Sequence, residues 1–231
     1  MNDPIAASSP FDDFSFADNP DPRCPVVLVL DCSASMAETL PGEDRPAIAA
    51  LNDGLDVLVA ELNRDPLARR RVEVAVVSFA TDAQVSADFA TVEHLVLPSL
   101  VAGGTTSMGA ALDLALDQVE SRKATYRAAG IRYYRPWVML ITDGLPTDDV
   151  SEAARRIHAA EADGSLAFFA VGVQGADLET LARLGTRAPL ALRGLAFDEL
   201  FVWLSASQRA VSASTPGDKV ALPSPQGWAE I

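Results

Sequence analysis

The sequence feature that most constrains the fold is an aliphatic run that ends in one carboxylate and two hydroxyls. Residues 26–30 are all valine or leucine, and Asp31, Ser33 and Ser35 follow them. A short valine-rich run bounded by Pro25 predicts a strand buried on both faces. Asp31 then lies at the carboxyl end of that strand, where open α/β sheets bind their ligands. We therefore expect the three polar side chains to form part of a cation site.

Strands and helices alternate along the rest of the chain. Apolar periodicity and turn residues predict helices at 46–63, 107–128, 151–163, 177–184 and 197–212, and strands at 72–79, 84–89, 137–142, 166–173 and 190–192. The link between strands 72–79 and 84–89 is so short that they must pair antiparallel. The sequence thus predicts an α/β fold: a single doubly wound, Rossmann-like sheet, mostly parallel with one antiparallel edge strand, and helices on both faces.

The chain of 231 residues contains no linker long enough to separate two domains. We expect an acidic N-terminal arm at 1–22, one domain at 23–213, and a proline-containing tail at 214–231 that packs on or near the domain, anchored by Trp228. The three arginines at 69–71 are expected in a solvated loop between a helix and a strand.

The overall charge limits the classes of partner. The formal net charge is −14, which disfavours a nucleic acid or an anionic membrane as partner and favours the binding of cations. No apolar run reaches the ~18 residues that a membrane-spanning helix needs. The acidic start of the chain also lacks the basic residues of a secretory signal.

The two cysteines, Cys24 and Cys32, flank the predicted first strand. Eight residues of extended chain separate them by about 26 Å, which is too far for a disulfide. Reduced thiols and the absence of an export signal indicate a cytoplasmic location.

Two further polar features are expected at the same edge of the sheet. Strand 137–142 leads into Asp143, and the glycine-rich loop 103–109 contains Thr105 and Thr106. Because the carboxyl ends of parallel strands share one edge, these side chains are expected to converge on a single point. The expected ligands are Asp31, Ser33, Ser35, Thr105 (with Thr106 as the alternative) and Asp143. An all-oxygen set of this kind favours a hard cation, with Mg²⁺ the leading candidate and Mn²⁺ or Ca²⁺ as alternatives.

This constellation resembles the metal-ion-dependent adhesion site (MIDAS) of the von Willebrand factor type A family. That family has Asp-x-Ser-x-Ser after the first strand, a threonine in a glycine-rich loop and an aspartate after a later strand. The matching segments here are Asp31-Cys32-Ser33-Ala34-Ser35, Gly103-Gly104-Thr105 and Thr142-Asp143-Gly144, with Ala34 where the family usually has glycine. Further segments, at 19–25, 52–55, 203–207 and 222–228, resemble the bacterial TerY/YegL-type subfamily, so that the resemblance covers roughly residues 15–231.

The resemblance implies a non-catalytic, metal-dependent domain that binds a protein partner, which offers a carboxylate to the open position of the metal. TerY-like proteins are associated with tellurite resistance and related bacterial stress responses, and they often accompany a PP2C-type phosphatase and a protein kinase. These associations come from the family alone.

Two other functions compete with metal-dependent binding. An aspartate after one strand and Asp-Gly after another also resemble phosphoryl-transfer enzymes of the haloacid dehalogenase type, but those enzymes need Asp-x-Asp, and Ser33 stands at the third position here. No carboxylate therefore stands at the position of the general acid–base group. The second competing reading is a scaffold whose metal site has degenerated, which the presence of every oxygen ligand disfavours.

Overall fold

The computed structural model describes residue 16 and residues 19–173, 175–225 and 227–230. Most of the predicted N-terminal arm therefore lies outside the described residues. The strands are β1 (Cys24–Asp31), β2 (Val72–Phe79), β3 (Ala83–Thr91), β4 (Trp137–Thr142), β5 (Ala167–Gly172), β6 (Leu190–Leu192) and β7 (Ala229–Glu230). The helices are a short 3-10 turn η1 (Ala34–Ala37), α2 (Ala47–Asn63), α3 (Pro66–Arg71), α4 (Met108–Ala128), α5 (Ser151–Ala162), α6 (Leu178–Ala182) and α7 (Phe197–Ala213).

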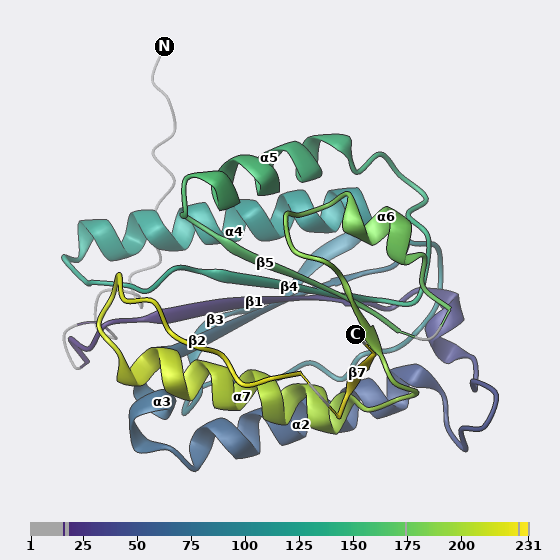
Figure 1. Ribbon diagram of the computed structural model, residues 1–231, viewed down its shortest axis with the longest axis horizontal. Coiled ribbons are helices and arrows are strands. Elements are labelled where there is room, and N and C mark those ends of the chain that lie inside the picture. Colours follow the sequence, from purple (N-terminus) through teal and green to yellow (C-terminus); the bar gives the residue numbers. More distant parts are fainter. Residues whose placement is uncertain (1–15, 17–18, 174, 226, 231) are drawn as a thin grey trace.

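The strands form one sheet in the order β3-β2-β1-β4-β5-β6-β7. The five strands β2, β1, β4, β5 and β6 run parallel to one another, and β3 pairs antiparallel with β2 at one edge. The helices α4 and α5 cover one face of the sheet, and α2, α3 and α7 cover the other (Figure 1). The predicted fold class is confirmed.

The aliphatic run in β1 is explained by its place at the centre of this sheet. Successive side chains of a strand point to opposite faces. Val27 and Val29 therefore pack among residues of α4 and α5, whereas Val26, Leu28 and Leu30 pack among residues of α2 and α7. Because both faces are covered, every residue of β1 is buried. This packing fixes the position at which Asp31 leaves the sheet.

The prediction of a solvated loop at 69–71 was wrong, because these arginines form the last turn of α3. Asp65 caps this helix: its Oδ1 accepts hydrogen bonds from the backbone nitrogens of Leu67 at 2.9 Å and Ala68 at 2.8 Å. Pro66 occupies the first helical position, where its missing N–H costs nothing. The Asp-Pro pair thus ends one helix and starts the next.

The C-terminal segment returns along α7 to the far edge of the sheet. Nε1 of Trp203 donates to the carbonyl of Pro223 at 2.8 Å. The indole of Trp228 is buried, with its ring centroid 5.3 Å from that of Trp203. The two residues of β7 then pair antiparallel with β6, an addition to the sheet that the sequence pattern did not predict.

Cys24 and Cys32 are both free and buried. No helix in the described part of the chain combines the length and the apolar character needed to cross a bilayer.

Candidate functional site

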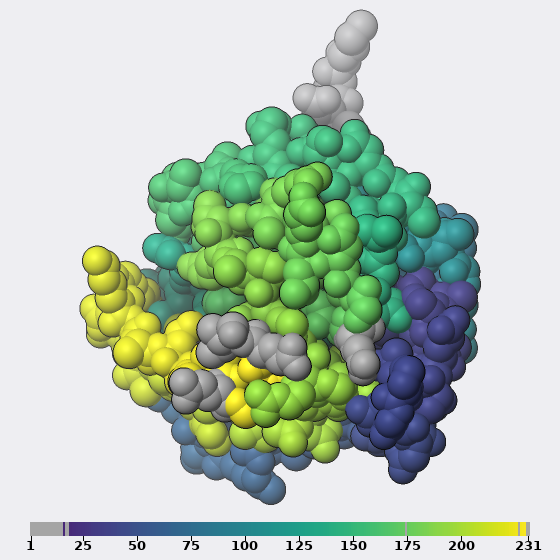
Figure 2. Space-filling view, turned by 45° about the vertical axis from the view of Figure 1, so that its right-hand side comes forward, coloured from purple at the N-terminus to yellow at the C-terminus, as the bar shows by residue number. Residues whose placement is uncertain are grey.

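Three loops meet at the carboxyl edge of the sheet. β1 and β4 are adjacent and parallel, with Leu30 paired to Ile141, so that Asp31 and Thr142 end neighbouring strands. The η1 turn follows β1 at the right-hand end of the sheet in Figure 1. Figure 2 brings that side forward, and the loop at 38–46, in dark blue and purple, projects from it at the lower right. The candidate site lies at this edge.

Asp31 is fully buried and is held through both of its oxygens. Oδ1 accepts a hydrogen bond from the backbone nitrogen of Ser33 at 2.8 Å, and Oδ2 accepts one from Oγ1 of Thr142 at 2.5 Å. Burial raises the pKa of the Asp31 carboxyl, although the bonds from Ser33 and Thr142 act in the opposite direction. The carboxylate is fixed in place, and no cationic side chain among the described residues forms an ion pair with it.

A chain of hydroxyls connects the two loops. Oγ of Ser33 lies 3.0 Å from Oγ of Ser35, which in turn donates to Oδ1 of Asp143 at 2.7 Å. Ser33 is buried, while Ser35 and Asp143 are partly exposed. Four of the predicted ligands, one of them Asp31, therefore come together, and the open side of the group faces solvent at Ser35 and Asp143.

The structure brings Thr106, rather than Thr105, to this group. Thr106 is buried and Thr105 is exposed. A point at the Cβ position of an alanine at Gly144 lies 3.3 Å from Oγ1 of Thr106 and 3.8 Å from Oδ2 of Asp31. The hydroxyl and the carboxylate therefore border the same small space. Of the two threonines that the sequence offered, Thr106 is therefore the one placed beside Asp31, because the loop register turns it inward.

Backbone contacts fix that loop register. The backbone nitrogen of Thr106 donates to Oγ1 of Thr147 at 3.2 Å, and the nitrogen of Thr147 donates to the carbonyl of Thr106 at 2.9 Å. The carboxylate of Asp148 accepts from the backbone nitrogens of Gly109 and Ala110, each at 2.9 Å, at the first turn of α4. The loop after β4 and the start of α4 therefore hold each other in place.

The electrostatics of the site favour a cation. Asp143 has a raised pKa, chiefly because of burial, with the nearby charges of Asp31 and Glu38 adding to the effect. Two carboxylates whose charged forms are disfavoured by burial, together with three hydroxyls, match the oxygen ligands of Mg²⁺. The described residues contain no group of three His, Cys, Asp or Glu side chains placed to hold a metal, so any ion bound here would depend on the hydroxyls.

Sequence reasoning missed Thr142 as a site residue. Its position directly before Asp143 was visible, but only the pairing of β4 with β1 shows that its hydroxyl faces Asp31.

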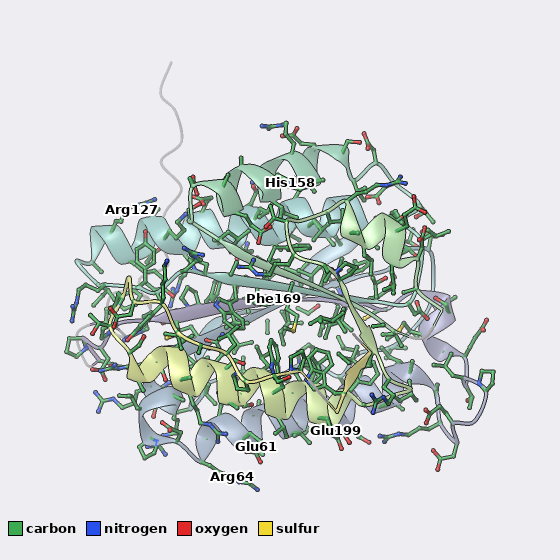
Figure 3. The ribbon with its side chains drawn as sticks, viewed as in Figure 1. Glu61, Arg64, Arg127, His158, Phe169 and Glu199 are labelled. Atoms are coloured by element: carbon green, nitrogen blue, oxygen red, sulfur yellow. The ribbon has the colours of Figure 1, made fainter. Side chains whose placement is uncertain are left out.

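His158 lies on α5 (Figure 3), where its Nε2 is 3.0 Å from the carbonyl of Arg183, outside this site. Burial raises the pKa of Cys32 to about 11, so this side chain is a neutral thiol at pH 7.

Comparison with known proteins supports this description. The family model of the von Willebrand factor type A domain matches residues 26–198. Comparison with curated proteins returned no match. Among solved structures, a von Willebrand factor type A protein from Catenulispora acidiphila is 19% identical with a TM-score of 0.57, covering 82% of this chain and 43% of that chain.

Two further solved structures are similar to this chain. One is a mutant of the PilB minor pilin from Streptococcus sanguinis, with 14% identity, a TM-score of 0.58, and 93% of this chain and 65% of that chain covered. The other is proximal thread matrix protein 1 from the mussel byssus with a zinc-occupied MIDAS motif. It is 17% identical with a TM-score of 0.53, and the match covers 83% of this chain and 49% of that chain. This chain spans less than two thirds of the length of each of these three proteins.

Proposed function

This chain belongs to the von Willebrand factor type A domain family, and from that premise we propose that it is a non-catalytic, metal-dependent protein-binding domain. The residues that would hold the ion are Asp31, Ser33, Ser35, Thr106 and Asp143. A bound Mg²⁺ supplies a positive charge to which a carboxylate of a partner protein can bind. Mn²⁺ and Ca²⁺ are alternative ions with the same preference for oxygen.

The observation that carries this proposal is the hydroxyl chain from Ser33 through Ser35 to Asp143. Ser35 and Asp143 are partly exposed and are joined at 2.7 Å, while Asp31 is buried behind them. A cation at this group would be held from the protein side and remain open on the solvent side. The mussel protein among the similar structures is described with zinc in its MIDAS motif, which supports an ion at the corresponding edge of the fold.

Phosphoryl transfer is the competing function, and the surroundings of Asp31 disfavour it. Both oxygens of this carboxylate accept hydrogen bonds, and Ser33 stands where an acid–base carboxylate is needed. Ser33 itself lies beside Ser35 rather than beside a basic side chain. General acid–base catalysis requires a group that exchanges protons near neutral pH. We therefore propose binding without chemistry.

The physiological setting follows from the TerY-like resemblance. We propose a bacterial stress response of the tellurite-resistance type, with a PP2C-type phosphatase and a protein kinase as partner proteins. The two free, buried cysteines suit the reducing cytoplasm, which we propose as the location.

Thermal unfolding with and without divalent ions tests the metal site. We expect Mg²⁺ or Mn²⁺ to raise the Tm of the wild-type chain, because ligands that bind only the folded state stabilise it. Asp143→Asn should remove this shift. Asp56→Asn, which changes an exposed carboxylate on α2, should retain it. A wild-type Tm that does not respond to either ion would overturn the proposal.

Partner capture tests the binding function. The wild-type chain and Asp143→Asn would be used as baits in a native extract, each with and without EDTA. We expect specific partners to bind only the wild-type chain in the presence of divalent ions. Partners that bind equally in chelator and to the variant would contradict metal-dependent recognition.

A further inference from the structure

A second site lies at the amino-terminal ends of the parallel strands, opposite the proposed metal site. It is a cavity of about 560 Å³ bordered by the first residues of β4 and β5, the C-terminal end of α7 and the segment 214–222. Its volume is within the range of small-molecule sites. The cavity lies at the first residue of β4 and the proposed metal site at its last, Thr142. At ~3.3 Å per residue, the six residues of β4 place the two sites about 20 Å apart. The cavity is therefore independent of the proposed metal site.

The inner wall of the cavity is aromatic. Trp137 and Phe169 both line it, are 5% and 8% exposed, and have ring centroids 4.6 Å apart. Phe169 lies on β5, in the space between the sheet and α7 (Figure 3). Val220 and Leu222 of the C-terminal segment add further apolar side chains to the lining. A flat apolar group would be well accommodated here.

The rim of the cavity is basic, in contrast to the rest of the protein. Four cationic side chains line it: Lys123, Arg135, Arg187 and Lys219. The chain has only two lysines, and both are in this set. Asp218 is the single carboxylate among the lining residues. In a protein with a net charge of −14, this is a local concentration of positive charge.

Two of these cations are paired with carboxylates that do not line the cavity. Nζ of Lys123, a residue only 7% exposed, donates to Oε1 of Glu120 at 2.7 Å. Arg187 pairs with Glu161, and its Cζ lies 5.1 Å from the ring centroid of Phe169. A guanidinium in that position extends the flat surface of the aromatic wall.

The other two cations are available to a ligand. Arg135 and Lys219 are exposed, and neither lies within 4 Å of a carboxylate in the ion pairs of the described residues. Hydrogen bonding chiefly lowers the pKa of Asp163, which is exposed at the C-terminal end of α5, and the nearby charge of Arg135 contributes to this shift. They come from separate segments, one before β4 and one in the C-terminal segment, and both border the cavity. An anionic group at the rim would be attracted by both without breaking a direct ion pair.

We propose that this cavity binds a small organic anion in which an acidic group is joined to a flat aromatic body. The ring occupies the space against Trp137 and Phe169, and the acidic group lies at the rim near Arg135 and Lys219. This ligand class satisfies both the apolar wall and the unpaired cations, whereas a bare anion or a neutral ring satisfies only one of them.

Binding of three matched probes tests the ligand class. The probes are 2-naphthalenesulfonate, its neutral analogue 2-naphthalenesulfonamide, and methanesulfonate, which has the charge without the ring. Titrations followed by tryptophan fluorescence and calorimetry should show the sulfonate binding at least ~10-fold more tightly than either analogue, a difference of ~1.4 kcal/mol. Equal binding of the sulfonate and the sulfonamide, or no binding of the sulfonate, would overturn the proposal.

Charge-reversal variants test whether the acidic group of the ligand lies near Arg135 and Lys219. Arg135→Glu and Lys219→Glu, together, should weaken 2-naphthalenesulfonate binding at least ~10-fold. Arg193→Glu reverses another exposed arginine, outside the lining and without an ion pair among the described residues, and should leave binding within ~2-fold. Circular dichroism and Tm establish that each variant is folded. A folded double variant that binds the sulfonate like the wild-type chain would refute the assignment.

Discussion

Thr142 donates its hydroxyl hydrogen to Oδ2 of Asp31 at 2.5 Å, across two adjacent parallel strands. Both side chains are fully buried. The bond leaves Oδ1 of Asp31 to accept from the backbone of Ser33, so that each oxygen of the carboxylate has a fixed direction. Hydrogen bonds from neighbouring side chains orient the groups that ligate a metal, so Thr142 would hold Asp31 in position for the proposed ion.

Replacing Thr142 with valine should weaken Mg²⁺ binding by about 10-fold or more, because the carboxylate of Asp31 loses the bond that orients it. Isothermal titration of Mg²⁺ measures the change. Thr125→Val removes a hydroxyl on the exposed surface of α4 and serves as the control. An unchanged affinity in Thr142→Val would show that Asp31 needs no such support.

Asp31→Asn should stabilise the metal-free protein at pH 7 while removing the response to Mg²⁺. The pKa of Asp31 is raised in the folded state by burial, so its contribution to stability is present below the unfolded value of ~3.9 and is lost as pH rises through the raised folded value. An amide has no such pH dependence. Urea unfolding at several pH values in EDTA checks both statements, and an apo variant less stable than the wild-type chain would contradict them.

Thr106→Ala should lower Mg²⁺ affinity more than Thr105→Ala. Thr106 is buried with its hydroxyl facing the space beside Asp31, whereas Thr105 is exposed. The two neighbouring substitutions remove the same group from the same loop, which makes each the control for the other. Equal losses of affinity would mean that the loop changes register when the ion binds.

Gly109→Ala should destabilise the fold by roughly 1–3 kcal/mol, the usual cost of overpacking. A Cβ at Gly109 would overlap the backbone carbonyl oxygen of Asp149, which cannot move without disturbing the cap that Asp148 makes on α4. Gly103→Ala meets no atom within 4 Å and should be near neutral. Urea unfolding of both variants compares them directly, and equal stabilities would rule out the close approach.

Glu73→Gln should destabilise the protein by roughly 3 kcal/mol or more, because it removes the charge that compensates two buried arginines. Glu73 is 2% exposed, and its oxygens accept from Nε of Arg23 at 2.9 Å, from Nε of Arg122 at 2.8 Å and from the hydroxyl of Tyr126. Glu93→Gln, whose partner Arg69 is 3.8 Å away at the surface, should change stability little. The measurement is urea unfolding, and similar losses in the two variants would contradict the argument.

The sequence by itself determined the class of fold and the edge at which the site lies. The run from Val26 to Leu30 requires two covered faces, and a parallel neighbour that leads into Asp143 places both aspartates at one edge. These inferences depend on local periodicity and on general rules for α/β sheets. They need no knowledge of which side chains touch.

Only the tertiary structure shows that Thr106 rather than Thr105 lies beside Asp31, and only it shows the bond from Thr142 to Asp31. The choice of threonine depends on the bonds between the loop of Thr106 and Thr147, which lie 41 residues apart in the sequence. The role of Thr142 depends on the register of β4 against β1. The basic cavity likewise joins Lys123 and Lys219 from distant segments. Side-chain contacts between distant segments depend on packing and register, which short-range sequence patterns do not encode.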